Sequence, residues 1–161
     1  MKWFTLLLLL GVGTASAACP DYFNVEQREL NSTQRHNLCQ LTEGKVVLVV
    51  NTASYCGYRG QFGDLKTLYQ TYKDKGLIVL GFPSNDFWHE SGDEDKTAAV
   101  CRRDDASPLY KGLAAAAGEA PGWNFHKYLI GRDGKLIASY GANQNPADDP
   151  LQKEVKRALG L

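Results

Sequence analysis

The sequence predicts an α/β domain in which helices cover a central mixed sheet, and three observations lead to that fold class. An apolar run rich in β-branched residues at 46–50 is followed by a segment with helical periodicity at 62–72 and by a second apolar run at 77–82. Strand–helix–strand units place their two strands in parallel, with a right-handed crossover. Two further extended segments flank an Asp-Gly turn, which is typical of an antiparallel hairpin.

The first strand and the helix after it form the centre of the predicted fold. The apolar run at 46–50 is too short to cross a membrane, and it is typical of a strand buried on both faces. In the following helix the apolar residues recur at helical spacing, at Phe62, Leu65, Leu68, Tyr69 and Tyr72. Gly76 ends this helix and precedes the second strand.

The remaining elements follow in a recognisable order. Residues 18–41 form an N-terminal extension with a turn and a short helix, and an acidic segment at 93–101 favours another helix. Pro108 begins a helix that Gly118 ends, residues 123–130 and 135–140 form the hairpin, and Leu151, Val155 and Leu159 mark a closing amphipathic helix at 148–159. This order predicts a thioredoxin-like three-layer sandwich with a central mixed sheet.

The first residues have the composition of an export signal. Lys2 precedes five consecutive leucines, and Ala15 and Ala17 are spaced as a cleavage site, so we expect a signal peptide at 1–17 and a single domain at 18–161. The protein is then periplasmic or secreted. Attachment as a lipoprotein through Cys19 is the alternative, but the leucine usual three residues before such a cysteine is missing. We therefore expect no membrane attachment.

Export makes the four cysteines informative. In an oxidising compartment Cys19 and Cys39 are expected to form a structural disulfide, the alternative being two unpaired thiols. The formal charge is zero and the sequence has no cationic run, so nothing favours a nucleic-acid partner. No pattern for a metal, flavin or nucleotide site is present, and we expect no cofactor.

Cys56 lies where the first strand gives way to the helix. Unpaired backbone N–H groups at a helix start favour the thiolate, which is the nucleophilic form of cysteine. The alternative is a small buried core residue. Thiol–disulfide exchangers need a second cysteine three residues on, and Arg59 occupies that position. Attack on a peroxide needs one thiolate and nearby hydrogen-bond donors, and it yields a sulfenic acid that another thiol must clear.

Three stretches resemble the glutathione peroxidase family in its cysteine-containing form. They read GKVVLVVNTASYCG, KGLIVLGFPSNDF and WNFHKYLIGRDGKLIASYG, and they fall within residues 44–141. The resemblance implies a thioredoxin-like fold and reduction of hydrogen peroxide and organic hydroperoxides. It also implies that Cys56 is the peroxidatic residue and that Trp123 and Asn124 are hydrogen-bond donors to the reacting atoms. The family's glutamine is absent, and His89 is its nearest positional counterpart.

The resemblance also bears on the reductant. Cys101 lies where members that use thioredoxin often carry a resolving cysteine, so glutathione or a thioredoxin-like dithiol is the expected electron donor. Only residues 102–107 separate Cys101 from Pro108, fewer than is usual in the family. This shortening and the histidine at 89 leave a catalytically weak or inactive thioredoxin-fold module as one alternative, and another thiol–disulfide oxidoreductase as the second. His36 and His126 are expected to be surface or hydrogen-bonded residues without a catalytic role.

Overall fold

A computed structural model describes residues 19–84, 87 and 107–161 of the 161-residue chain. The central sheet has four strands, β3 (Val46–Thr52), β4 (Leu77–Pro83), β5 (Lys127–Ile130) and β6 (Leu136–Tyr140). Their order across the sheet is β4-β3-β5-β6. β3 runs parallel to β4 and antiparallel to β5, and β5 is antiparallel to β6. The predicted mixed sheet is therefore confirmed.

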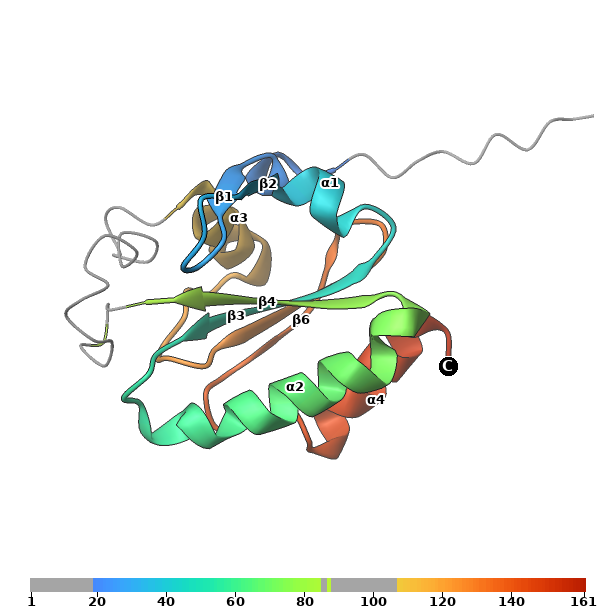
Figure 1. The fold of residues 1–161 in the computed structure, drawn as a ribbon. Coiled ribbons are helices and arrows are strands. Elements are labelled where there is room, and N and C mark those ends of the chain that lie inside the picture. The colour runs from blue at the N-terminus through green and yellow to red at the C-terminus, as the bar shows by residue number, and fades with distance from the viewer. Residues whose placement is uncertain (1–18, 85–86, 88–106) are drawn as a thin grey trace, which may run out of the picture.

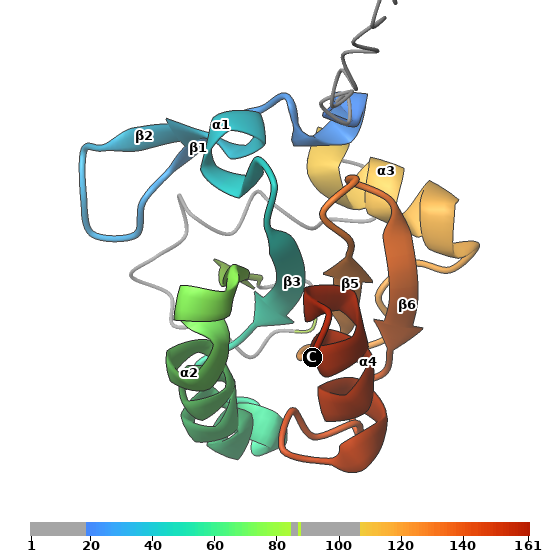
Figure 2. The same ribbon diagram turned by 90° about the vertical axis from the view of Figure 1, so that its right-hand side faces the viewer.

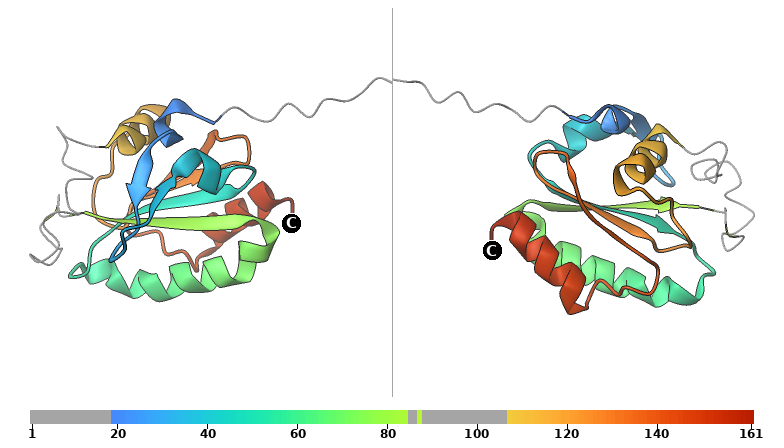
Figure 3. Two further views of the ribbon diagram at one scale, coloured as in Figure 1. Left: turned by 45° about the horizontal axis from the view of Figure 1, so that its top comes forward. Right: turned by 180° about the vertical axis from the view of Figure 1, so that it is seen from behind.

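Helices cover both faces of the sheet, which gives three layers (Figure 1). Helices α2 (Gln61–Tyr72) and α4 (Asp149–Leu159) lie on one face, and α3 (Pro108–Ala117) lies on the other. The view from behind in Figure 3 shows the same separation of α4 from α3 by the sheet. Each face has its own apolar cluster. One joins Val46, Leu48 and Val50 of β3 to α2 and α4, and the other joins Val47 and Val49 to α3.

The strand β3 is buried at all seven positions, as its apolar run predicts. The helix α2 also has the predicted limits. It passes into a 3-10 turn, η3 (Lys73–Lys75), and Gly76 then takes the left-handed conformation at φ 97°. The predicted apolar face of α2 is only partly right, because Leu65 and Leu68 are buried whereas Phe62 and Tyr69 are 44% and 41% exposed.

The two later helices, α3 predicted from its end residues and α4 from its apolar stripe, are both confirmed. Ser107 caps α3 by accepting a hydrogen bond from the Tyr110 N–H, and Gly118 ends the helix in the left-handed conformation. In α4 the three apolar residues of the predicted stripe, Leu151, Val155 and Leu159, are all buried. The predicted helix at 93–101 lies outside the described residues.

The hairpin of β5 and β6 is shorter at its start than predicted. The sequence pattern predicts an extended strand from residue 123, but β5 begins only at Lys127. The reason is a left-handed backbone at Phe125, with φ 64°, which is incompatible with a continuous strand. The segment before β5 is therefore a turn. Trp123 and Asn124, the two residues before Phe125, lie in this turn.

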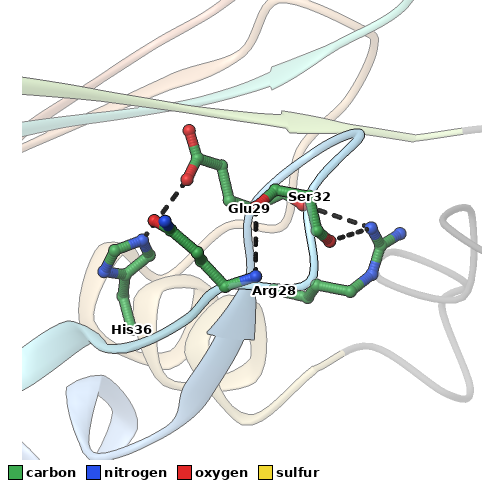
Figure 4. Close-up of polar contacts among 5 residues, drawn as sticks. Arg28, Glu29, Ser32 and His36 are labelled. Atoms are coloured by element: carbon green, nitrogen blue, oxygen red, sulfur yellow. Dashed lines mark hydrogen bonds and ion pairs between the residues drawn. The ribbon is translucent and has the colours of Figure 1, made fainter.

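The N-terminal extension contains more structure than the predicted turn and short helix. A 3-10 turn, η1 (Asp21–Phe23), precedes a two-stranded hairpin of β1 (Glu26–Arg28) and β2 (Arg35–Asn37) and the helix α1 (Leu38–Thr42). The hairpin projects at one side of the molecule in Figure 2. Figure 4 shows how polar contacts close its loop: the Arg28 guanidinium donates to the Ser32 carbonyl at 2.9 Å, and His36 pairs with Glu29 at 3.5 Å.

Two helical glycines give a matched test of this packing. A Cβ atom at Gly112 in α3 would overlap the side chain of Tyr22 in η1, whereas a Cβ at Gly63 in α2 meets nothing within 4 Å. We expect Gly63→Ala to stabilise the protein by about 1 kcal/mol, because alanine is the better helix former. Gly112→Ala should instead destabilise it by about 1–3 kcal/mol, as overpacking does. Urea unfolding of both variants tests this, and equal shifts in the same direction would contradict the packing of η1 on α3.

Candidate active site

Cys56 follows β3 by four residues and precedes a 3-10 turn, η2 (Gly57–Gly60), that runs directly into α2. Its carbonyl accepts a hydrogen bond from the Arg59 N–H at 3.0 Å, which starts the turn. The residue is 2% exposed and belongs to the apolar cluster between the sheet and α2 and α4. Its neighbour Tyr55 is 64% exposed, so Cys56 is covered but lies directly under the surface. Among the described cysteines it is the one with a free thiol.

Trp123 and Asn124 lie at the same edge of the sheet. Strand β5 pairs with β3 up to Lys127, which is opposite Val50. Beyond that pair the contact continues, because the Phe125 N–H donates to the Asn51 carbonyl at 2.6 Å. The Phe125 ring packs edge-on against Phe62 in the first turn of α2, with ring centres 5.1 Å apart, and shares its buried cluster with Cys56. The structure therefore brings the segment 123–125 to the edge from which the chain continues to Cys56.

The Asn124 side chain places a buried amide at this edge of the sheet. The residue is completely buried, and neither its amide nitrogen nor its amide oxygen has a hydrogen-bond partner among the described residues. Gln61 at the start of α2 has one such atom, its Oε1, while its amide nitrogen donates to the Ala142 carbonyl at 2.7 Å. A buried polar group without a partner costs about 1–3 kcal/mol, so it calls for an explanation such as a ligand.

Trp123 is 42% exposed, and its ring lies against that of Phe87, with centres 5.0 Å apart. Phe87 follows β4, so residues from the ends of three strands approach one another here. His89 and Cys101 lie outside the described residues, and their roles stay predictions. Trp123 and Asn124 are placed at the edge that leads to Cys56, and their catalytic role also stays a prediction.

Asn51 is a residue of this site that the sequence analysis did not single out. It lies near the end of β3, it is completely buried, and its side chain contacts the segment before β5. The side-chain amide donates to the Trp123 carbonyl at 3.2 Å, and its oxygen accepts from the His126 N–H at 2.9 Å. The one signal in the sequence is that a polar residue ends an otherwise apolar strand.

Lys127 is a second residue near this site that the sequence analysis did not single out. Its side chain is fully buried, and its ammonium donates to the carbonyls of Phe125 and Gln144, both at 2.7 Å. Burial lowers the pKa of Lys127 to about 8, because the charged form loses its hydration. No pattern in the sequence identifies a lysine at the start of a strand as buried. Through its bond to the Phe125 carbonyl, Lys127 stabilises the turn before β5.

The two remaining histidines are hydrogen-bonded or paired, as expected. The His126 Nε2 lies 2.8 Å from the Ser139 hydroxyl, which donates to Glu119 at 2.6 Å. Burial lowers the pKa of His126, and the nearby Glu119 carboxylate partly offsets that effect. His36 lies in the N-terminal hairpin, away from this edge, where it pairs with Glu29.

Cys19 and Cys39 are joined by a disulfide, with their Cα atoms 5.7 Å apart. The bridge lines a cavity of about 560 Å³ together with Lys45 and Arg132, the residues just before β3 and just beyond β5. This is the end of the sheet opposite to Cys56, so the bridge and the candidate active site are separate. Within the described ranges, no helix is long and apolar enough to cross a membrane.

Known proteins share both the sequence and the fold. The family model for glutathione peroxidase matches residues 21–113. A glutathione peroxidase-like peroxiredoxin, gpx1 of Schizosaccharomyces pombe, is 36% identical over 138 residues, covering 73% of this chain and 86% of the relative. A glutathione peroxidase of Lactococcus lactis is 38% identical over 138 residues, covering 73% of this chain and 87% of the relative.

Solved structures agree. The crystal structure of Trgpx in its apo form has a TM-score of 0.70 at 33% identity and covers 89% of this chain and 98% of its own. A thiol:disulfide interchange protein of the thioredoxin family from Chlorobium tepidum is similar in fold alone, with a TM-score of 0.55 at 20% identity over 76% of this chain and 85% of its own.

Proteins with the thioredoxin fold carry out disulfide exchange or peroxide reduction. The residues around the cysteine therefore have to show which of the two reactions a given protein performs. An exchanger's second cysteine would stand at position 59, which is an arginine, and the segment with the buried amide of Asn124 lies at the end of the sheet from which the chain continues to Cys56. This combination defines a thiol peroxidase. The extent of the sequence match makes the assignment particular: the chain belongs to the glutathione peroxidase family.

The buried lysine gives stability a pH dependence. In the unfolded chain a lysine keeps a pKa near 10.5, so between about pH 8 and 10.5 the unfolded state binds more protons than the folded state. Stability therefore rises with pH across this window, by a total on the order of 3 kcal/mol.

We expect Lys127→Met to remove this rise. Denaturant unfolding at pH 7, 9 and 10.5 measures it, with Lys153→Met on the exposed face of α4 as the control. If wild type and Lys127→Met show parallel pH curves, the lysine is not buried as a cation.

Proposed function

We propose that this protein reduces hydrogen peroxide and organic hydroperoxides at Cys56. The observation that carries the proposal is the buried amide of Asn124, which has no hydrogen-bond partner within residues 19–84, 87 and 107–161 and lies at the edge of the sheet that leads to Cys56. A donor kept without a partner is available to the charge that develops during the reaction, and such preorganised donors stabilise transition states.

The reaction balances as follows. The Cys56 thiolate attacks one peroxide oxygen, the O–O bond breaks, and the sulfur is oxidised to a sulfenic acid. The departing oxygen takes the electron pair of that bond and leaves as water or an alcohol after accepting a proton. The Trp123 indole N–H and the Asn124 amide are the donors proposed to stabilise the developing negative charge. His89, which replaces the family's glutamine, is the proposed third donor.

The sulfenic acid is then cleared by thiols. In the proposed route the Cys101 thiol attacks the Cys56 sulfur, water leaves, and a disulfide forms between the two residues. A thioredoxin-like dithiol then reduces this bridge, whereas with glutathione two molecules of the tripeptide supply both electrons. The peroxiredoxin name of the Schizosaccharomyces pombe relative supports the dithiol route.

Export is also proposed. The leucine-rich start of the sequence supports a signal peptide at 1–17, and the disulfide between Cys19 and Cys39 suits a protein that matures in an oxidising compartment. The protein then acts in the periplasm or outside the cell, in the defence against oxidative stress.

Substitution of the two cysteines tests the route. Cys56→Ser should abolish turnover of hydrogen peroxide with every reductant, because the nucleophile is lost. Cys101→Ser should keep the first, stopped-flow oxidation of Cys56 but lower steady-state turnover with thioredoxin by about 100-fold or more. After one equivalent of peroxide, mass spectrometry of the wild type should show a peptide that joins Cys56 to Cys101. A thiol oxidised no faster than free cysteine would instead indicate an inert module.

Replacement of the Asn124 amide by an apolar side chain should raise the thermal stability of the protein and lower its rate of Cys56 oxidation. Asn124→Leu removes a buried polar group without a partner, so we expect thermal unfolding at a higher temperature. The same change removes a proposed donor and should slow oxidation of Cys56 by about 100-fold. Tyr22→Phe, which loses a hydrogen bond to the Gly134 carbonyl at the far end of the sheet, serves as the control and should keep the wild-type rate. An Asn124→Leu variant that is less stable and equally fast would contradict the assignment.

A further inference from the structure

We propose that Asn51 is a positioning residue for this reaction, which holds Trp123 and Asn124 in place beside the strand that leads to Cys56. The inference rests on the proposed function of those three residues. It assigns a task to a residue that touches no reacting atom in the mechanism above.

Asn51 makes its hydrogen bonds to a single short segment of the chain. All four hydrogen-bonding groups of Asn51 are directed at the segment before β5. Its side-chain amide and oxygen bond to the Trp123 carbonyl and the His126 N–H, at 3.2 and 2.9 Å. Its backbone carbonyl accepts from the Phe125 N–H at 2.6 Å, and its own N–H donates to the His126 carbonyl at 3.3 Å. One buried residue thus fixes the backbone on both sides of Asn124.

The segment needs such a support because its conformation is not the one its residues prefer. Phe125 has a left-handed backbone, which is rare for an aromatic residue and costs about 1–3 kcal/mol. The aromatic residues of Trp-Asn-Phe favour an extended strand, which would continue β5 backwards along β3. The side-chain oxygen of Asn51 instead accepts from the His126 N–H, the group that a continuous ladder would pair with the Asn51 carbonyl, and the side-chain amide donates to the Trp123 carbonyl.

The task is specific to an amide of this length. It requires a donor toward the Trp123 carbonyl and an acceptor toward the His126 N–H on one short side chain. Aspartate keeps the acceptor and loses the donor, and leucine loses both. Lys127 supports the same segment from the other side, where its ammonium donates to the carbonyls of Phe125 and Gln144. Asn51 therefore joins the part of the chain that carries the thiol to the part that carries its donors.

The test is a double-mutant cycle in the full chain, read as the second-order rate of Cys56 oxidation by hydrogen peroxide. Asn51→Leu should slow this oxidation by about 100-fold, the size of effect that misplaced catalytic groups produce. In an Asn124→Leu background the same change should cost about tenfold or less, because of the two donors that Asn51 positions Trp123 alone is then left. A residue with only a structural role would cost the same factor in both backgrounds.

Two controls keep the result decisive. Leu77→Ala removes a buried side chain at the other end of the sheet, and it should lower stability while leaving the rate per folded molecule unchanged. Asn51→Asp differs from the wild type by a single group, and it carries the test if Asn51→Leu does not fold. All rates are referred to the folded fraction measured by circular dichroism.

The outcomes are distinct. Rapid oxidation of wild type and equally rapid oxidation of the Asn51 variants would overturn this inference and leave the peroxidase in place. Equal losses in both backgrounds would overturn it as well. Slow oxidation of the wild-type thiol, at the rate of free cysteine, would instead overturn the proposed function on which the inference depends.

Discussion

The hydrogen bonds between the end of β3 and the segment before β5 are the contact on which the candidate site depends. β3 is buried along its whole length and is packed from both faces, so its last residues are held firmly. Asn51 transfers that rigidity to a turn that would otherwise be free to extend. Because Cys56 follows on the same chain after only a short loop, the thiol and its proposed donors share one support.

Several features of this edge lower stability. The Asn124 amide is buried without a hydrogen-bond partner in the described part of the chain. Lys127 is a buried cation that bonds only to carbonyls in the described contacts, and Phe125 has a left-handed backbone. Together they cost several kcal/mol, a large part of the stability of a typical domain. Strain of this kind persists where the surrounding structure determines the conformation, and it gathers at functional sites. The two apolar clusters and the disulfide at the opposite end of the sheet offset the cost.

The same architecture supports disulfide exchange in proteins of similar fold, such as the interchange protein from Chlorobium tepidum. A thiol in the turn between β3 and α2 can serve either reaction, because both begin with a cysteine sulfur attacking an electrophile. The neighbouring groups decide between them. An arginine stands three residues after Cys56, and the turn before β5 carries the indole and the amide that we propose as donors. The chemistry is thus set by residues added to the fold and not by the fold.

The sequence by itself determined the elements whose signals are local. Continuous apolar runs indicated β3 and β4, helical spacing indicated α2 and α4, and the end residues Pro108 and Gly118 indicated α3. The motif around Cys56 and Trp123 identified the family. The N-terminal hairpin was missed because its strands have three polar residues each and no apolar alternation. Only the tertiary structure decided the turn at Phe125, the burial of Lys127 and the role of Asn51. Each of these depends on atoms that are far apart in the chain and meet only after the sheet has formed, so no pattern along the sequence records them.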